Sequence, residues 1–417
     1  MSDIFIKEIQ IDEVRNLANI SIPISGEQKK NLIITGKNGT GKTSLLNAIS
    51  RNLSFLLENG DYTQIEHRIR AYEQQLSVAI TNNNSENDIS RWTNNVENEK
   101  RRLLDVKAGV LLRLNNPVNS LKSHFENNEF VVAYYRAKRE FKSDIPNHIE
   151  KVNLKDRYTL NESPRIEFVK YIVDLKMKEA LARTSGKNEV ADTIHRWFME
   201  FDNLLKAIFE DDSTALVFDE ENFTFSIVQA NKQPFGFNVL SDGYAAVLDI
   251  VVDIMMRMEK HTNRSFVFDM PGIVFIDEIE THLHIELQRN VMKLLTTFFP
   301  NIQFIVTTHS PFIINSVENA VVFDLETRTL AKDGLSNIPY EGIVEGYFGA
   351  DLLSDELRNK FERYKDLIKK EVISDTDIEE IMNLETYLEE IPDYLGLDIS
   401  TEYHRLKLEF HTRGDKL

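Results

Sequence analysis

Short apolar runs alternate along the chain with segments in which apolar residues recur every three or four positions. The runs predict strands at residues 31–35, 130–135, 272–278, 301–309 and 319–326. The longer period predicts helices at 41–57, 163–183, 191–210 and 284–299, and another that starts at Gly243. Alternating positions predict an edge hairpin within 3–24 and a second hairpin within 214–229. Strands that alternate with helices place the core among parallel α/β folds.

Between Gln64 and Leu114 the apolar residues recur at spacings of four and three, on both sides of the polar stretch 81–88. This pattern predicts two antiparallel helices with a polar tip, an arm of about 30 Å if each helix has about 20 residues. The alternative interpretation is two amphipathic helices that lie on the domain. After about Ser336 the pattern is helical and acidic, with ten acidic residues and no Lys or Arg in 375–402. We expect a packed helical appendage there.

The composition narrows the class of protein. A chain of 417 residues with 42% hydrophobic content can form one to three domains. No apolar run approaches the ~18 residues of a membrane span, and the N-terminus lacks the features of a signal peptide. The chain has no cysteine, which excludes disulfides and thiolate metal sites. We therefore expect a cytoplasmic protein with no membrane partner.

The formal net charge of −18 repels nucleic acid on average, so binding of DNA would need a local basic groove. The stretch from Arg136 to Arg157 contains seven basic and four acidic residues and is a modest candidate. A solvated surface of mixed charge explains the same stretch equally well.

The segment "GKNGTGKTS" separates a predicted strand from a predicted helix and has the spacing of a phosphate-binding loop. Backbone N–H groups of such a glycine-rich turn surround the phosphates of a nucleotide at the start of a helix. Lys42 supplies a positive charge for the β- and γ-phosphates, and Thr43 supplies a hydroxyl for Mg²⁺. The predicted ATP-binding residues are Gly36, Lys37, Asn38, Gly39, Thr40, Gly41, Lys42, Thr43 and Ser44.

Three later motifs carry candidate chemistry. Asp277 and Glu278 follow a buried strand, where Asp277 would hold Mg²⁺ and Glu278 would orient and deprotonate the attacking water. His309 follows the next strand and is a candidate sensor of the γ-phosphate, although a lone histidine there is more often structural. Ser241, Asp242 and Gly243 open a helix and form a second anion site, or simply a helix cap.

The order of these motifs resembles the ATP-binding-cassette (ABC) ATPases, within them the SMC/RecF-like group with helical insertions. The resemblance implies that two heads sandwich two ATP molecules, with Ser241 and Gly243 of one protomer touching ATP held by Lys42 of the other. Residues 279–284 would cross that dimer interface; metal binding by His282 and His284 is the alternative.

Several positions depart from the family pattern. Asp242 replaces a glycine and Tyr244 a glutamine of the usual signature. No glutamine lies between Gln75 and Gln229, so the usual Mg²⁺-contacting glutamine is missing. Arg136 or Arg139, after the strand at 130–135, are candidates to reach the nucleotide or DNA.

The pair "FIDEIETHLH" and "IVTTHSPFIINS" resembles more closely the ATPases of the overcoming-lysogenisation-defect type, including ATPase subunits of anti-phage systems such as PARIS and Septu. The fold expected is α/β, an ABC-ATPase head with a mixed β-sheet, a short helical coiled-coil insertion and a C-terminal helical region. The expected segments are the N-terminal lobe with the phosphate loop (1–62), the coiled-coil hairpin (63–115), the return strand (116–150), a helical insertion (151–212), the C-terminal lobe (213–335) and the acidic helical region (336–417).

The leading hypothesis is a slow regulatory ATPase that uses ATP and Mg²⁺, forms a homodimer of heads or a higher homo-oligomer, and controls a separate effector in anti-phage defence. The resemblance implies a Toprim or HNH nuclease-like effector and DNA or a phage protein as trigger. A RecF-like DNA-repair ATPase that binds duplex DNA is the main alternative. A structural hub with little hydrolysis stays open, whereas a membrane-transport motor fits the inserted arm poorly.

Overall fold

The computed structural model describes residues 4–144, 150–332, 335, 342, 355–370, 373–389 and 397–414. The chain divides into two compact units, residues 1–338 and 339–417. Each unit is described by itself below.

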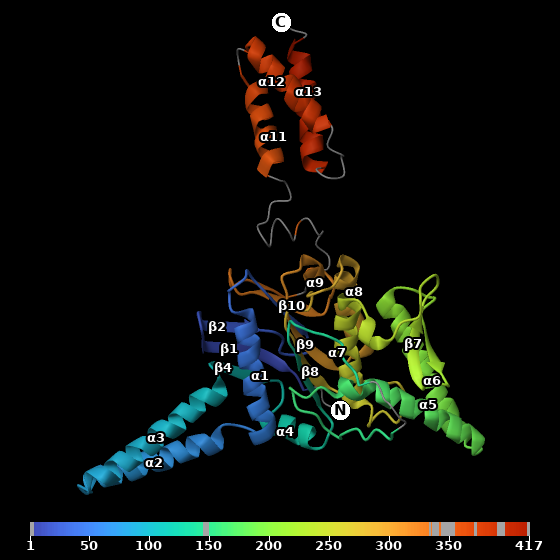
Figure 1. The fold of residues 1–417 in the computed structure, drawn as a ribbon. Coiled ribbons are helices and arrows are strands. Elements are labelled where there is room, and N and C mark those ends of the chain that lie inside the picture. The colour runs from blue at the N-terminus through green and yellow to red at the C-terminus, as the bar shows by residue number, and fades with distance from the viewer. Residues whose placement is uncertain are drawn as a thin grey trace. The chain divides into compact units, whose positions relative to one another are not determined.

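A six-stranded sheet in the order β11-β10-β3-β9-β8-β5 forms the centre of the first unit (Figure 1). Its strands are β3 Asn31–Thr35, β5 Val131–Tyr135, β8 Gly272–Ile276, β9 Ile302–Thr307, β10 Ala320–Asp324 and β11 Leu330–Ala331. All neighbours pair in parallel except β11, which runs antiparallel to β10. The inner strands β3, β8 and β9 are buried along their whole length because both faces of the sheet are covered. The predicted α/β class with a mixed sheet is confirmed.

One face of the central sheet packs against helix α1 (Lys42–Asn59) and a smaller sheet of order β2-β1-β4. That sheet contains β1 Ile6–Val14, β2 Leu17–Pro23 and β4 Val110–Leu114. The hairpin expected at 3–24 therefore exists, but it pairs with β4 in a sheet of its own instead of extending the edge of the central sheet. Helices α7 (Asp242–Met258) and α8 (Ile285–Phe298) lie on the other side of the central sheet, and short α9 (Pro311–Asn315) follows β9 (Figure 1).

Helices α2 (Thr63–Thr81) and α3 (Glu86–Lys107) pack against each other as the predicted pair and project from the sheet layers (Figure 1). The second helix ends earlier than predicted, since the residues up to Leu114 form β4. Gly109 explains the break: it has φ +73°, and a Cβ there would lie 1.8 Å from the carbonyl oxygen of Glu13 in β1. Close approach to β1, which the apolar spacing cannot reveal, stops the helix.

The base of this helical pair is attached to α1 through Asn52. The Asn52 side chain is fully buried, and its amide nitrogen lies 3.0 Å from the Lys107 carbonyl oxygen and 3.2 Å from that of Val110. The same nitrogen lies 2.6 Å from the Tyr62 hydroxyl, just before α2. One side chain of the helix that follows the phosphate loop thus satisfies backbone acceptors at the end of α3.

The segment between β5 and α7 contains the predicted helices and hairpin. Its elements are η1 Pro164–Glu167, α5 Phe168–Thr184, α6 Asn188–Phe209, β6 Ala215–Asp219, β7 Thr224–Val228 and η2 Phe237–Val239. Short helix α4 (Val118–Glu126), before β5, was not predicted. Buried rings on α5 and α6, such as Phe168, Trp197 and Phe201, stack on one another and form the interior of this region.

Glu259, at the C-terminal end of α7, is buried among these helices. It accepts a hydrogen bond of 2.7 Å from the Tyr171 hydroxyl and one of 3.3 Å from the Trp197 indole nitrogen. Burial raises the pKa of Glu259 to about 7, and these two hydrogen bonds partly oppose the effect. The folded chain therefore binds a proton here more tightly than the unfolded chain does.

We expect Glu259→Gln to gain stability relative to wild type as the pH rises from 5 to 8. A carboxyl group whose pKa is higher in the folded state lowers the free energy of unfolding as pH rises between its two pKa values, here about 4.5 and 7. The differential gain is at most about 3 kcal/mol. Urea unfolding at several pH values measures this gain, and Glu200→Gln, at an exposed position of α6, is the control. A difference between Glu259→Gln and wild type that stays constant with pH contradicts the assignment.

The second unit contains α11 (Asp355–Ile368), α12 (Asp375–Glu389) and α13 (Leu397–Gly414). Apolar residues of the three helices form their own core, which includes Phe361, Tyr364, Ile381, Leu388 and Tyr403. The packed helical appendage expected after Ser336 is confirmed for 355–370, 373–389 and 397–414; 336–341, 343–354, 371–372, 390–396 and 415–417 lie outside the described residues. Within the described part of the chain, no helix is both long enough and apolar enough to cross a membrane.

Candidate active site

The predicted phosphate loop lies between β3 and α1 and leaves the start of α1 open. Gly36, Gly39 and Gly41 have φ values of +135°, +83° and +101°, a region that favours glycine. A Cβ at Gly39 would have no neighbour within 4 Å, so this exposed position of the loop faces open space. The first N–H groups of a helix have no intrahelical acceptor, and this geometry suits the phosphates of a nucleotide.

Lys42 points back into this loop. Its Nζ donates to the carbonyl oxygens of Gly36 at 2.8 Å and Lys37 at 3.0 Å, and only 5% of the residue is exposed. Burial lowers the pKa of Lys42, while the carboxylates of Glu278 and Glu280 favour its charged form. The ammonium group is thus a cation among acids, with bonds that it can exchange for phosphate oxygens.

The other predicted loop residues form its outer wall. Asn38 is exposed, and Ser44 is half-buried in the first turn of α1. The Thr40 hydroxyl donates to the Lys37 carbonyl oxygen at 2.9 Å. Lys37 is exposed and pairs with Glu326 at 2.8 Å, after β10, which ties the loop to the neighbouring strand.

Asp277 connects the loop helix to two strands. It directly follows β8, is 3% exposed, and its Oδ1 accepts hydrogen bonds from the Thr43 hydroxyl at 3.1 Å and from the Thr307 hydroxyl of β9 at 2.7 Å. The two predicted Mg²⁺ ligands, Thr43 and Asp277, are therefore neighbours. A hydroxyl and a carboxylate at the edge of the phosphate loop are the donor set that Mg²⁺ uses beside nucleotide phosphates.

Glu278 has an unusual backbone conformation for a side chain of its size. Its φ is +45°, in the left-handed region. Its amide donates to the Thr307 hydroxyl oxygen at 2.7 Å, and its Oε2 accepts from the Thr281 hydroxyl at 3.4 Å. The carboxylate belongs to the same edge of the sheet as Asp277 and Lys42.

His309 follows β9 and lies beside Glu280, a residue that the motifs did not single out. The His309 amide donates to Glu280 Oε1 at 2.5 Å. His309 Nε2 and Glu280 Oε2 are buried, and neither has a hydrogen-bond partner among the described residues. Burial, followed by the charge of Lys42, lowers the pKa of His309 and favours the neutral imidazole. An unpartnered ring nitrogen beside Lys42 fits a phosphate oxygen as its missing partner.

The residues Ser241–Gly243 open α7, on the opposite side of the sheet from α1. Ser241 and Asp242 are exposed, and the Ser241 side chain makes no capping hydrogen bond. Gly243 is required by packing within the chain, because a Cβ there would lie 2.9 Å from the His282 carbonyl oxygen. Among the described residues no hydrogen bond or ion pair joins this segment to the phosphate loop, so one chain does not bring the two together.

The proposed reach of Arg139 to nucleotide or DNA is wrong. Arg139 is 4% exposed, and its guanidinium donates to backbone carbonyls next to Asp277. Arg136 is exposed. The basic stretch is also partly neutralised, since Lys138 and Lys142 both pair with Glu140. Within the described ranges no group of three or more His, Asp or Glu side chains is arranged to hold a metal ion, so His282 and His284 belong to no such cluster there.

Comparison with known proteins agrees with the nucleotide-binding site that this geometry indicates. A family model described as "AAA domain, putative AbiEii toxin, Type IV TA system" matches residues 32–315, more than half of the chain. The Septu protein PtuA of Bacillus mycoides (strain KBAB4) is 26% identical over 411 residues, which are 92% of this chain and 50% of that protein. The chain thus spans half the length of this relative.

Two further matches are more distant. The "Retron Vc95 probable ATPase" of Vibrio cholerae serotype O1 biovar El Tor is 23% identical over 424 residues, 84% of this chain and 81% of that protein. A solved SMC head bound to the C-terminal winged-helix domain of ScpA is 14% identical, with a TM-score of 0.38, over 79% of this chain and 98% of that chain.

The resemblance to Septu-type ATPases that the ordered motifs predict is confirmed by these relatives. The matched family region begins in β3, directly before the phosphate loop, and ends in α9, after His309. It therefore contains each predicted site residue, from Gly36 to His309. On this basis the chain belongs to the AAA-domain family of ATPases that this family model describes.

Proposed function

We propose that this protein is a slow regulatory ATPase of an anti-phage system, which binds Mg-ATP at 36–44 and controls a separate effector. The observation that carries the proposal is the convergence of Lys42, Asp277, Glu278 and His309 at one edge of the sheet. The defence setting is supported by the relatives named Septu protein PtuA and Retron ATPase. A nuclease or toxin on another chain is the effector proposed.

Each residue of this edge has a distinct role in the proposed reaction. Lys42 exchanges its bonds to loop carbonyls for bonds to the β- and γ-phosphates. Thr43 and Asp277 hold Mg²⁺, which when bound neutralises charge on the phosphate oxygens. Glu278 orients a water molecule and accepts its proton, and His309 Nε2 binds the γ-phosphate.

The site is proposed to be completed by a second head. Ser241 is exposed at an open helix start, and in the described part of the chain no hydrogen bond or ion pair joins it to its own phosphate loop, so a partner's nucleotide is its proposed ligand. Asp242 adds a negative charge at this surface, which opposes closure on a triphosphate and fits slow turnover. Closure of the two heads is the change that would hold or release the effector.

The RecF-like alternative has less support. Binding of duplex DNA needs a continuous basic surface, whereas Arg139 is buried and Lys138, Lys142 and Lys155 are paired with acids.

We expect a non-hydrolysable ATP analogue to convert wild-type protein to a dimer, or to an even-numbered higher oligomer, and Ser241→Arg to prevent this. A long cation at the helix start occupies the space of the partner's γ-phosphate, while binding to the chain's own loop is unaffected. Mass photometry and titration with a fluorescent analogue measure the two properties. Ser90→Arg, on exposed α3, is the control for added charge.

Dimerisation of Ser241→Arg at the wild-type nucleotide concentration contradicts the shared site. A wild-type mass that does not change with nucleotide contradicts nucleotide-driven closure.

A further inference from the structure

A buried arginine holds the backbone on both sides of Glu278. Arg139 comes shortly after β5, and its guanidinium donates to the carbonyl oxygens of three consecutive residues: Asp277 at 2.8 Å, Glu278 at 2.9 Å and Ile279 at 3.1 Å. A fourth hydrogen bond, of 3.1 Å, goes to the Arg136 carbonyl oxygen of its own turn. Only a planar guanidinium has several donors in a fixed arrangement that suits such a set of acceptors.

The segment that Arg139 binds needs external support. A left-handed backbone costs about 1–2 kcal/mol for a residue with a Cβ, and Glu278 is such a residue at φ +45°. Its amide is held by Thr307 and its carbonyl by Arg139. These two contacts determine where the Cα–Cβ bond of Glu278 points, and therefore where its carboxylate lies.

Arg139 is also connected electrostatically to α7, the helix that Ser241 opens. Burial lowers the pKa of Arg139, and Asp249 of α7 has the largest effect among the carboxylates that favour its charged form. Asp249 is 2% exposed and forms an ion pair with Arg165. Burial raises the pKa of Asp249 to about 7, and the charges of Arg165 and Arg139 partly oppose this effect.

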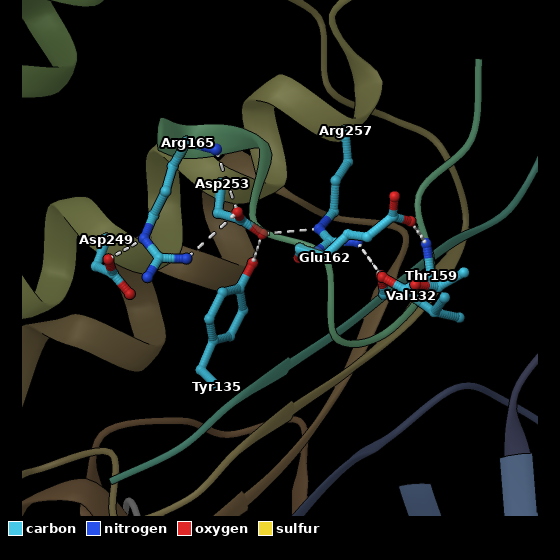
Figure 2. A network of polar contacts seen from close by, with 8 residues as sticks. All are labelled: Val132, Tyr135, Thr159, Glu162, Arg165, Asp249, Asp253 and Arg257. Carbon is cyan, nitrogen blue, oxygen red and sulfur yellow. Dashed lines mark hydrogen bonds and ion pairs between the residues drawn. The ribbon is translucent and has the colours of Figure 1, made fainter. Parts of the chain in front are cut away.

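The rest of α7 is fixed to β5 by a second set of polar contacts, shown in Figure 2. Asp253, one turn after Asp249, accepts a hydrogen bond of 2.7 Å from the Tyr135 hydroxyl and pairs with Arg257 at 2.7 Å. Arg165 lies between the two carboxylates and contacts both (Figure 2). Helix α7 and β5 are therefore joined by polar contacts between buried side chains, separately from the contacts of Arg139.

We propose that Arg139 is a positioning residue for ATP hydrolysis, which fixes the backbone of Glu278 from the turn that follows β5. This inference rests on the proposed function, in which Glu278 activates water. Its consequence is that a displacement of the turn after β5 changes the position of Glu278 in the same head. Arg139 does not touch nucleotide in this role.

The test is Arg139→Lys, which retains the charge but replaces two donor nitrogens in a fixed plane with a single nitrogen. We expect kcat to fall about 10- to 100-fold with the dissociation constant of an ATP analogue within about twofold of wild type, since a small misplacement of a catalytic group costs this much. Arg257→Lys is the matched control. Arg257 is also 4% exposed and donates to the carbonyl oxygens of Val132, Thr159 and Glu162, away from Glu278.

A double variant separates positioning from simple destabilisation. In Glu278→Gln the carboxylate is already absent, so adding Arg139→Lys should lower kcat by less than about twofold further. Arg139→Gln, which keeps a planar end but has only one donor nitrogen, should lower kcat in the same non-additive way. It also keeps the test decisive if Arg139→Lys does not fold.

The outcomes distinguish this inference from the proposed function. If wild type hydrolyses ATP and Glu278→Gln does not, the proposed function stands. The inference is then overturned if Arg139→Lys matches Arg257→Lys in kcat, or if its effect multiplies with that of Glu278→Gln. If wild type does not hydrolyse ATP, the proposed function fails and the inference fails with it.

Discussion

Glu278→Gln is expected to lower kcat for ATP hydrolysis by about 1,000-fold and to leave nucleotide affinity close to that of wild type. General-base catalysis contributes between about 100- and 10,000-fold, and the amide of glutamine cannot accept the proton of water. Glutamine has almost the same shape, so the Thr281 contact and the backbone conformation can persist. Phosphate release in a coupled assay measures kcat, and titration with a fluorescent ATP analogue measures affinity.

Glu286→Gln is the control for this change, because Glu286 is exposed in the first turn of α8. Its kcat should stay within about twofold of wild type, as for a surface substitution away from the site. In cells that carry the chain with the proposed effector, Glu278→Gln should also change the efficiency of plating of phage. If Glu278→Gln hydrolyses ATP at the wild-type rate, Glu278 is not the catalytic base. If the variant loses hydrolysis but still protects cells from phage, defence does not depend on ATP turnover.

A mixture of two inactive variants, Lys42→Ala and Ser241→Arg, is expected to recover activity that neither has alone. Removal of Lys42 takes the only ammonium group from the phosphate loop's interior, and its loss should reduce hydrolysis at least about 100-fold. In a symmetric dimer, each site would take Lys42 from one chain and Ser241 from the other. A mixed dimer then has one site with both defects and one intact site.

Only a mixed dimer contains an intact site, which is one of its two, so activity of up to about half that of wild type is expected. Different affinity tags on the two variants verify that mixed dimers form. If mixed dimers form and the mixture has no more activity than either variant alone, Lys42 of one chain and Ser241 of the other do not share a site. It would leave the arrangement around Lys42 within one chain unaffected.

The sequence predicts the parts of this site that are contiguous. The glycine loop, Asp277–Glu278 and His309 each directly follow a buried apolar run, and strand ends of a parallel sheet meet at one edge. Their convergence could therefore be predicted from local pattern and motif order. The helices of the C-terminal region were predictable for the same reason, since each buries an apolar stripe.

The supporting contacts could not be predicted in this way. Arg139 reads as an exposed base in a charged stretch, and only the approach of β5 to β8 places its guanidinium against three carbonyls. The role of Glu280 in the site follows only from the structure, in which the His309 amide, just after β9, donates a hydrogen bond to its carboxylate. Gly109 ends α3 because of β1, nearly a hundred positions away in the chain. Each of these depends on tertiary packing between distant segments, which single-sequence periodicity does not contain.

The attachment of Asn52 has a mechanical consequence. Because this side chain of α1 binds the backbone at the base of α3, a tilt of α1 is passed to the helical pair without an intervening flexible joint. Helix α3 has 22 residues and is about 33 Å long. A rotation of only five degrees at its base displaces the far end by about 3 Å, roughly the length of a hydrogen bond. A tilt of α1, the helix that follows the phosphate loop, would therefore appear as a lateral displacement at a point remote from the nucleotide.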